Sequence, residues 1–186
     1  PLTAANLEQL QQQIAELKPE AVAINLLFSF LDASAEKQIE AALPAQLFIS
    51  RSSEVLPEYK EYERGISTWL NAWIGPLVER YLKRLNDALP QTSIAVMQSS
   101  GGTIAAPLAG KQAVRMLLSG PAGGVIGGRW TGQHCDTGNV ITIDIGGTSA
   151  DISVIQDGEQ VALDNSDGLT LNLNLGFQRV LKNNDA

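Results

Sequence analysis

The chain has little of several residue types, and each scarcity narrows what it can do. It contains one cysteine and one histidine, Cys135 and His134, in 186 residues. A single cysteine excludes an internal disulfide and is typical of a reducing compartment, so we expect a cytoplasmic protein. One adjacent His–Cys pair is too few ligands for a zinc site. We interpret both as surface loop residues.

Basic residues and long apolar runs are also scarce. Thirteen Lys and Arg against 20 Asp and Glu give a net charge of −7, which argues against nucleic acid or an anionic membrane as a partner. No apolar run approaches the roughly 18 residues that a membrane-spanning helix needs. The opening residues are polar with helical spacing, unlike a signal peptide. The chain starts with Pro1 and not Met, so we expect its natural start to be missing.

The residues that are present predict an α/β protein. The apolar share is 44%, rich in Ala, Leu and Ile, which suits such a fold. The apolar positions of Ala4–Leu17 recur at helical spacing and predict an amphipathic helix. Ala21–Phe28 is continuously apolar and predicts a buried parallel strand. A second helix ending near Leu43 and a second strand at Leu47–Ser50 complete a predicted βαβ unit.

The middle of the chain predicts a connector and a long helix. Ser50–Arg64 is polar, and we interpret its charges as a solvated face. From Ile66 to Leu89, apolar residues repeat at three and four, which predicts a helix with a wide apolar face. Gly75–Pro76 should kink that helix or split it in two. We assign Trp69 and Trp73 to its core face and not to a ligand platform.

A serine–glycine loop, Ser99–Gly102, follows a predicted strand at Ser93–Gln98. Loops at the carboxyl ends of strands bind ligands in α/β proteins. A tight turn would have the same composition. Both interpretations stay open, and Gly101 and Gly102 are candidate cofactor-binding residues under the first.

A glycine-rich segment, Gly120–Gly128, opens a predicted helix with Pro121 near its first turn. Before it, Val114–Leu118 is either a short strand or part of a helix from Pro107. Small side chains in a helix let another backbone come close, at some cost in helix propensity. The alternative is a flexible glycine loop. The small residues that predict close packing are Gly120, Ala122, Gly123 and Gly127.

The stretch VITIDIGGTSADISV organises the rest of the chain. The β-branched run Val140–Ile143 ends in Asp144, Gly146–Ser149 turn the chain, and Ile152–Ile155 resume strand character. This pattern predicts a β-hairpin with a glycine tip. A third antiparallel strand, Gln160–Leu163, follows an Asp-Gly turn.

The tip of this hairpin holds the residues that we expect to bind a ligand. Its backbone N–H groups have no side chain in front of them, and Thr148 or Ser149 adds a hydroxyl. Consecutive exposed N–H groups form an anion cradle. Asp144 and Asp151 flank it, and a carboxylate beside a phosphate requires a cation, usually Mg²⁺. The alternative is a plain hairpin whose glycines supply positive φ; the complete run D-I-G-G-T-S-x-D favours phosphate binding.

The last residues carry one further pattern. Leu169–Leu175 alternates apolar and polar residues and predicts a strand with one apolar face. Lys182–Ala186 is expected to be loose.

Five segments of the chain carry a resemblance to a known family. They are AVAINLLFSFL (Ala21–Leu31), SSEVLPEYKEYER with Thr68 and Asn71 after it, MQSSGG (Met97–Gly102), LLSGPAGGVIGG (Leu117–Gly128) and DIGGTSADIS (Asp144–Ser153). Together they resemble the hydantoinase/oxoprolinase A-subunit family, which also includes acetone-carboxylase-type subunits. Arg64, Thr68 and Asn71 match the family's pattern, but the pattern assigns them no role.

The resemblance implies a fold of the actin-like ATPase superfamily, in which two ribonuclease-H-like halves surround a nucleotide. We therefore expect a partial ribonuclease-H-like α/β fold, a mixed sheet flanked by helices. Residues 1–58 would be the C-terminal part of the first half. Residues 59–135 would hold linking helices, a strand and the connecting helix, and residues 136–186 would start the second half with the phosphate-loop hairpin.

The resemblance also implies ATP and Mg²⁺ as cofactors. Asp144 would be catalytic and face the metal-bound water, and Asp144 and Asp151 would be the metal residues. Gly146, Gly147 and Thr148 would hold the β- and γ-phosphates. The residues assigned to the cofactor are Gly146, Gly147, Thr148, Ser149, Gly101, Gly102, Gly120 and Gly123.

The family uses ATP to phosphorylate the carbonyl oxygen of a cyclic amide, such as a hydantoin or 5-oxoproline, before ring-opening hydrolysis. A B-type partner subunit is common. The expected first phosphate loop and the later glycine-rich adenosine stretch have no match here, so we expect an internal fragment with little activity alone. The alternatives are a non-enzymatic nucleotide-responsive module, an acetone-carboxylase-type ATP-binding subunit, or an acidic scaffold in which the glycines only form turns.

Overall fold

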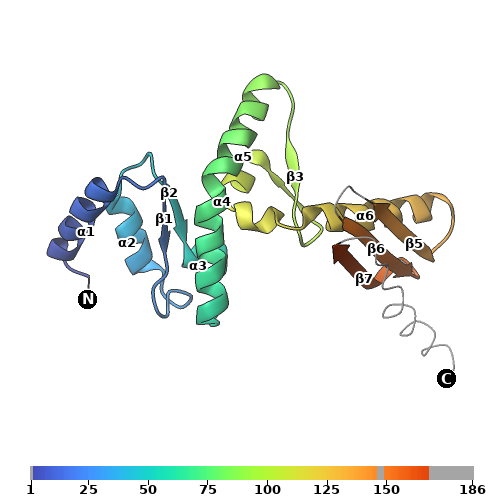
Figure 1. Cartoon of the computed structure of the whole chain (residues 1–186), viewed down its shortest axis with the longest axis horizontal. Helices are drawn as coiled ribbons and strands as arrows, with labels where there is room; N and C mark the ends of the chain where they lie inside the picture. The colour runs from blue at the N-terminus through green and yellow to red at the C-terminus, as the bar shows by residue number, and fades with distance from the viewer. Residues whose placement is uncertain (1, 146–148, 168–186) are drawn as a thin grey trace. The chain divides into compact units, whose positions relative to one another are not determined.

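Figure 1 shows the computed structural model of the chain, which describes residues 2–145 and 149–167. Of Ser149 and of residues 162–167, only the backbone is described. The chain forms two compact units. Unit 1 comprises residues 1–96 and 103–117, and unit 2 comprises residues 97–102 and 118–186. The assignment of these parts to ribonuclease-H-like halves stays a prediction.

Unit 1 opens with the predicted βαβ unit. Helix α1 (Ala4–Leu17) starts at a capping box, in which Thr3 and Asn6 each satisfy the other's backbone N–H. Strands β1 (Ala21–Ile24) and β2 (Phe48–Arg51) pair in parallel, with α2 (Ser34–Ala42) between them in the chain. The buried residues Ile24, Ile39 and Leu43 form their core. The first helix and the βαβ unit are therefore confirmed.

The predicted strand Ala21–Phe28 is too long, because β1 ends at Ile24. Side chains take up the backbone groups of Leu26 that a strand ladder would use. Its N–H donates to Glu36 Oε1 at 3.0 Å, and its carbonyl oxygen accepts from Arg64 Nη2 at 3.0 Å. Phe28 then has φ of 59°, outside the strand region. Leu26 thus still packs against the core, whereas Leu27, Phe28 and Leu31 lie in an exposed turn.

The predicted connector contains helix α3 (Ser52–Val55) and the first turn of helix α4 (Glu61–Ala88). Arg64 is fully buried, so its interpretation as part of a solvated face is wrong. Helix α4 runs through Pro76 as one element (Figure 1). Gly75 is needed beside it, because a Cβ there would overlap the ring of Phe48.

The assignment of Trp69 and Trp73 to the core is also wrong. Their exposed fractions are 54% and 69%. The first half of α4 packs inward through small and polar residues, because Arg64, Thr68, Asn71, Ala72, Gly75 and Pro76 are buried there, and Leu82 is the buried residue farther along the helix. The apolar repeat is therefore split: Trp69, Trp73 and Leu77 are exposed, whereas Val78 and Leu82 belong to the core.

The rest of unit 1 packs against the second half of α4. Strands β3 (Ala95–Met97) and β4 (Thr103–Ala105) pair, and helix α5 (Ala106–Lys111) and a 3₁₀ helix, η1 (Ala113–Met116), follow. Leu82, Ala106 and Ala109 form the core. The strand that we predicted as one alternative for Val114–Leu118 is absent, since η1 occupies most of that segment.

Unit 2 is a helix on a three-stranded antiparallel sheet. Helix α6 (Ser119–His134) precedes β5 (Val140–Ile145), β6 (Ser149–Gln156) and β7 (Glu159–Asp167), in that order in the sheet. The hairpin, the third strand and the helix are confirmed. The fold class, mixed α/β with small sheets flanked by helices, is confirmed as well.

The close-packing positions of α6 differ from the prediction. A Cβ on Gly128 would overlap Thr142 Cγ2, and one on Gly132 would lie 2.6 Å from Val140 Cγ2. Three of the positions that we predicted to pack closely have no close neighbour. No described atom would lie within 4 Å of a Cβ on Gly120, Gly123 or Gly127. The helix therefore approaches the sheet through its second half.

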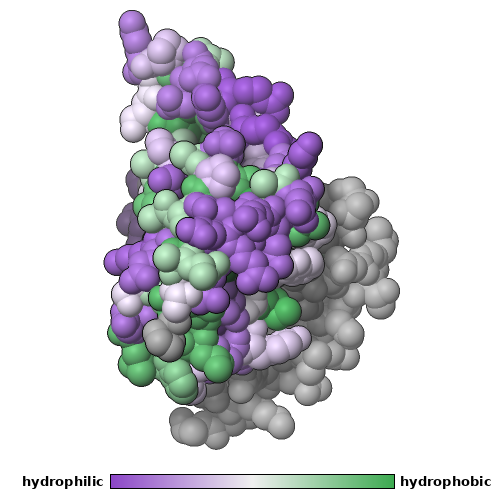
Figure 2. Space-filling model, turned by 90° about the vertical axis from the view of Figure 1, so that its left-hand side faces the viewer, coloured by the Kyte–Doolittle hydropathy of each residue, from purple (hydrophilic) through white to green (hydrophobic). Residues whose placement is uncertain are grey.

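No helix among the described residues is long and apolar enough to cross a lipid bilayer. On the face that Figure 2 shows, hydrophilic side chains predominate, with hydrophobic patches between them.

Candidate nucleotide and metal site

The β5–β6 hairpin positions the two predicted metal residues. In its register Asp144 pairs with Asp151, and Ile145 with Ala150 closes the ladder before the tip. Gly146, Gly147 and Thr148, predicted to bind phosphate, lie outside the described residues. Ser149 is described only as strand backbone, so its predicted role stays a prediction too.

Asp144 and Asp151 line one cavity of about 240 Å³. Asp144 is exposed and Asp151 half-buried. Directly opposed residues of an antiparallel pair project from the same face of the sheet. The other lining residues are Thr142, Ile143 and Ser153 from the sheet and Pro121, Gly124 and Val125 from α6. The structure thus brings the hairpin acids to the first turns of the glycine-rich helix.

The donor set of this cavity fits Mg²⁺. Like charges directly opposite on neighbouring strands destabilise the pair, and a bound cation removes that penalty. Mg²⁺ is commonly held by one or two carboxylates together with waters and phosphates. Among the described residues, no group of three or more His, Cys, Asp or Glu side chains could hold a metal ion. The two carboxylates alone would not fill the coordination shell of Mg²⁺. This arrangement therefore suits an ion whose other ligands are phosphate oxygens and water.

The Ser99–Gly102 loop is a tight turn that also lines a cavity. Gly101 N–H donates to Gln98 O at 3.0 Å, and Gly101 has φ of 86°, which favours glycine. A Cβ on Gly101 would lie 3.2 Å from Ile126 Cδ1 of α6. A cavity of about 640 Å³ lies between this turn, α6 and strand β6, with Arg129 and Gln160 at its edge. The turn interpretation is confirmed, and the cofactor role of Gly101 and Gly102 stays a prediction.

Helix α6 joins the two cavities, since Pro121 and Val125 line both. The helix begins after Leu118, whose φ of 63° turns the chain into it. Gly120 and Gly123 lie in its open first turns. Helix N-termini attract anions, but nothing in the described residues tests a cofactor role for either glycine.

A family model described as "Hydantoinase/oxoprolinase" matches residues 64–175 of the chain. The chain belongs to the hydantoinase/oxoprolinase family. This confirms the resemblance drawn from its motifs.

Two relatives illustrate the family. The caprolactamase subunit alpha of Pseudomonas jessenii is 34% identical over 167 residues, covering 85% of this chain and 24% of that protein. The 5-oxoprolinase 1 of Arabidopsis thaliana is 29% identical over 160 residues, covering 82% of this chain and 12% of that protein. The chain thus spans a quarter or less of the length of these relatives.

Two solved structures share the fold. The crystal structure of the ATP-dependent caprolactamase of P. jessenii matches with a TM-score of 0.69 and 32% identity, over 83% of this chain and 23% of that chain. A nucleotide-free acetone carboxylase structure matches with a TM-score of 0.73 and 24% identity, over 90% of this chain and 27% of that chain. Both structures match the mixed α/β fold over most of this chain, in agreement with the predicted fold class.

The family match begins at Arg64, whose role the sequence left unassigned. Its guanidinium is fully buried and lies 5.4 Å from the ring of Phe30. It pairs with Glu61, and its hydrogen bond lowers the pKa of that carboxyl. Its other acceptors are Asn25 Oδ1, Ser52 Oγ, Glu58 O and Leu26 O, at 2.8–3.3 Å. Arg64 therefore fixes the turn after β1 against the start of α4.

Glu36 holds the same turn from the other side. Its buried carboxylate accepts from Leu26 N at 3.0 Å, Ser52 Oγ at 2.6 Å and Ser53 N at 2.9 Å. Burial acts to raise its pKa, but these hydrogen bonds outweigh burial and lower the pKa. Ser52 thus joins the buried anion to the buried Arg64 cation.

Asn71 and Thr68 continue this buried polar face. Asn71 Nδ2 donates to Ser50 Oγ at 3.1 Å and Lys111 O at 2.9 Å, and its Oδ1 accepts from Val114 N at 3.1 Å. Thr68 Oγ1 donates to Arg64 O at 2.6 Å. These residues link β2, α4 and η1, so their role in the described structure is architectural. The sequence could have revealed this face, because Arg64, Thr68 and Asn71 are four and three residues apart and so lie on one side of a helix.

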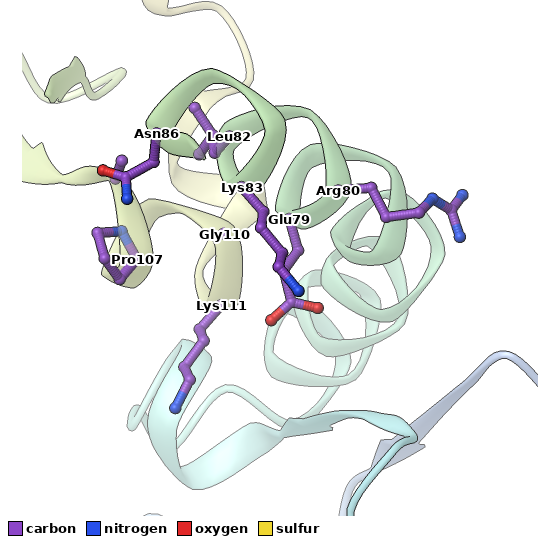
Figure 3. Close-up of a pocket in the computed structure, with 9 residues that line it drawn as sticks. Glu79, Arg80, Leu82, Lys83, Asn86, Pro107, Gly110 and Lys111 are labelled. Carbon is purple, nitrogen blue, oxygen red and sulfur yellow. The ribbon is translucent and has the colours of Figure 1, made fainter. Parts of the chain in front are cut away.

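A further cavity of about 490 Å³ lies between α4 and α5 in unit 1 (Figure 3). Lys83, Lys111 and Arg80 stand at its edge. In Figure 3 the Arg80 side chain points away from the others, and it pairs with Glu20. The cations therefore do not converge on one point, and this cavity does not resemble a built anion site.

Proposed function

We propose that this chain carries the phosphate- and metal-binding part of an ATP-dependent enzyme that opens a cyclic amide. The observation that carries the proposal is the opposition of Asp144 and Asp151 one pair before the hairpin tip, at a cavity shared with α6. Family membership and the similarity to an ATP-dependent caprolactamase support it.

In this proposal Asp144 and Asp151 hold Mg²⁺, and Asp144, the more exposed of the two, is the residue assigned to catalysis. The N–H groups of Gly146, Gly147 and Thr148 and the Ser149 hydroxyl orient the phosphates. ATP, when bound, supplies the phosphoryl group that activates the amide carbonyl oxygen. The chain's own contribution is positioning and charge neutralisation, which dominate catalysis of phosphoryl transfer.

The substrate class rests on the relatives. Caprolactamase and 5-oxoprolinase are named for caprolactam and 5-oxoproline, and both compounds are cyclic amides. Since one relative is a subunit alpha, we also propose a second kind of subunit as a partner. A cytoplasmic location, which the single cysteine favours, belongs to the same proposal.

The test is ATP hydrolysis by the complete gene product with Mg²⁺, with and without 5-oxoproline or caprolactam. We expect hydrolysis to depend on one of these amides and to be lost in Asp144→Asn. Asp157→Asn is the matched control, because Asp157 lies at the other end of β6 and should keep activity. Nucleotide-dependent release of a partner protein without any amide would favour a non-enzymatic module. Full activity of Asp144→Asn would show that Asp144 has been given the wrong role.

A further inference from the structure

Glycines at every fourth residue of α6 follow the face of strand β5 that the helix covers. A Cβ on Gly132 would lie 2.6 Å from Val140 Cγ2, and one on Gly128 would overlap Thr142 Cγ2. Four residues advance a helix by about 6 Å, and two residues advance a strand by about 6.8 Å. Because the two steps nearly match, the next glycine of the series lies beside the next residue on that face of β5.

This next pair is Gly124 and Asp144, and here the packing opens. Both residues line the cavity of about 240 Å³, together with Asp151. No described atom would lie within 4 Å of a Cβ on Gly124. Gly132 is buried, Gly128 is half-buried and Gly124 is exposed. The space between the helix and the sheet therefore widens toward the hairpin tip.

Packing does not explain the glycine at position 124. Glycine inside a helix costs about 1 kcal/mol relative to alanine. At Gly128 and Gly132 the close contact with β5 requires glycine, whereas no described atom requires it at Gly124. All the glycines of α6 belong to the described part of the chain, and Gly124 is the one that lines the cavity with the two acids. Its missing side chain keeps that cavity open.

A pair of hydroxyls forms the inner end of this cavity. Thr142 and Ser153 oppose each other two ladder pairs farther from the tip than the acids, and their hydroxyls hydrogen-bond each other. Ser153 is buried. The room for a ligand thus lies at the outer end, between the carboxylates and Gly124. A water molecule needs only about 10–15 Å³ of such space, so a cation, its waters and one phosphate group fit.

We propose that Gly124 sets the room for the phosphate in this site. The place of its missing side chain admits the phosphate group that shares Mg²⁺ with Asp144 and Asp151. The carboxylates lie on the sheet face that α6 covers, so a phosphate that completes the coordination of the ion must lie on the helix side. A side chain at position 124 would occupy that place. This inference rests on the proposed function and adds Gly124 to its site.

Melting temperatures of the complete gene product test the proposal. Without ligand, Gly124→Ala and Gly124→Val should melt at or near the wild-type temperature, because a Cβ there meets no described atom within 4 Å. Excess MgCl₂ and ATP should raise the melting temperature of the wild type, raise that of Gly124→Ala less, and leave that of Gly124→Val unchanged. Gly127→Val is the matched control and should keep the full rise, since Gly127 is equally free of described neighbours and lies outside the cavity.

Steady-state ATP hydrolysis supplies a second readout. A side chain that only takes up the room of the phosphate weakens nucleotide binding, so Gly124→Ala should raise the KM for ATP more than it lowers kcat. A purely structural role of Gly124 would not produce that split. A lowered kcat with an unchanged KM would contradict the proposal.

The outcomes distinguish this proposal from the proposed function. A wild-type protein that does not respond to MgCl₂ and ATP would refute the proposed function, and the role of Gly124 with it. If the wild type responds, Asp144→Asn does not, and Gly124→Val keeps the full response, the site stands and only the role of Gly124 is wrong. A Gly124→Val variant that melts well below the wild type without ligand would mean that another part of the protein fills this place, which would also overturn the inference.

Discussion

Asp144 and Asp151 lie directly opposite each other on the antiparallel strands β5 and β6, one pair before the end of the ladder. Their side chains share a face and a cavity. In a structure selected for stability alone, a like-charged pair at this position would be a net cost. The arrangement is readily explained when the pair has a cation to bind.

The first prediction concerns magnesium and this pair. Without metal, Asp144→Asn should stabilise the chain by about 0.2–1 kcal/mol, because it removes the repulsion across the strands. In the complete gene product, excess MgCl₂ and ATP should raise the wild-type melting temperature, since a ligand that binds only the native state stabilises it by mass action. The rise should be absent in the variant. Differential scanning calorimetry measures both effects.

Asp157→Asn is the control for that prediction. It removes one negative charge from the same sheet, at a turn where φ of 51° suits either residue. The magnesium response should survive in this variant. A response equally weakened in both variants would indicate general charge screening and not a site.

The second prediction concerns Arg64. Lysine in its place keeps the positive charge. It lacks the planar guanidinium, whose several N–H donors point in fixed directions. Asn25, Glu58 and Leu26 would lose hydrogen bonds in a buried setting. Arg64→Lys should therefore lower the free energy of unfolding by about 1–3 kcal/mol, the cost of leaving buried acceptors without a partner, measured by urea denaturation. Arg84→Lys, on the exposed side of α4, should change it by less than about 0.5 kcal/mol.

The elements that sequence reasoning predicted well are those with a clear period or turn signal. The hairpin of Val140–Gln156 follows from β-branched runs around a glycine tip, and α6 follows from Pro121 near its first turn, although its several glycines lower its helix propensity. The carboxylate pair follows from the same hairpin, because equal offsets from the tip put Asp144 and Asp151 opposite each other. In each case, residue types that lie close together in the sequence were enough to predict the structure.

Helix α4 shows where such reasoning fails. Periodicity locates an apolar face but cannot tell which face a tertiary neighbour covers. Here a buried Arg64, Thr68 and Asn71 satisfy one another and their neighbours, so the polar face turns inward and Trp73 outward. The same limit applies to Gly128, whose contact with Thr142 depends on how the helix crosses the sheet.

The third prediction concerns Glu36 and pH. Hydrogen bonds hold its pKa below the unfolded value of about 4.3. The stabilisation is therefore fully present above that pH and is lost as the pH falls through the folded-state pKa. Glu36→Gln should lower the free energy of unfolding at pH 7, because an amide cannot accept from Leu26, Ser52 and Ser53 at once. The difference from wild type should shrink as the pH falls from about 5 to 3.

Urea denaturation at several pH values measures this difference. Asp32→Asn is a useful comparison, since Asp32 also accepts hydrogen bonds, from the N–H and hydroxyl of Ser34, and these lower its pKa. Asp32 is exposed, so its variant should show a much smaller loss at pH 7. A Glu36→Gln penalty that is constant from pH 7 to pH 3 would mean that the carboxylate charge is not what stabilises the turn.

The fourth prediction uses two neighbouring glycines of α6 that have opposite surroundings. A Cβ on Gly128 would overlap Thr142 Cγ2 and lie 3.6 Å from Ile155 Cδ1, whereas a Cβ on Gly127 meets no described atom within 4 Å. Gly128→Ala should force the helix away from the sheet and cost about 1–3 kcal/mol. Gly127→Ala should stabilise the chain by up to about 1 kcal/mol, through helix propensity alone. Thermal melts of the two variants separate these outcomes, and equal effects of both substitutions would show that α6 does not pack on β5 through Gly128.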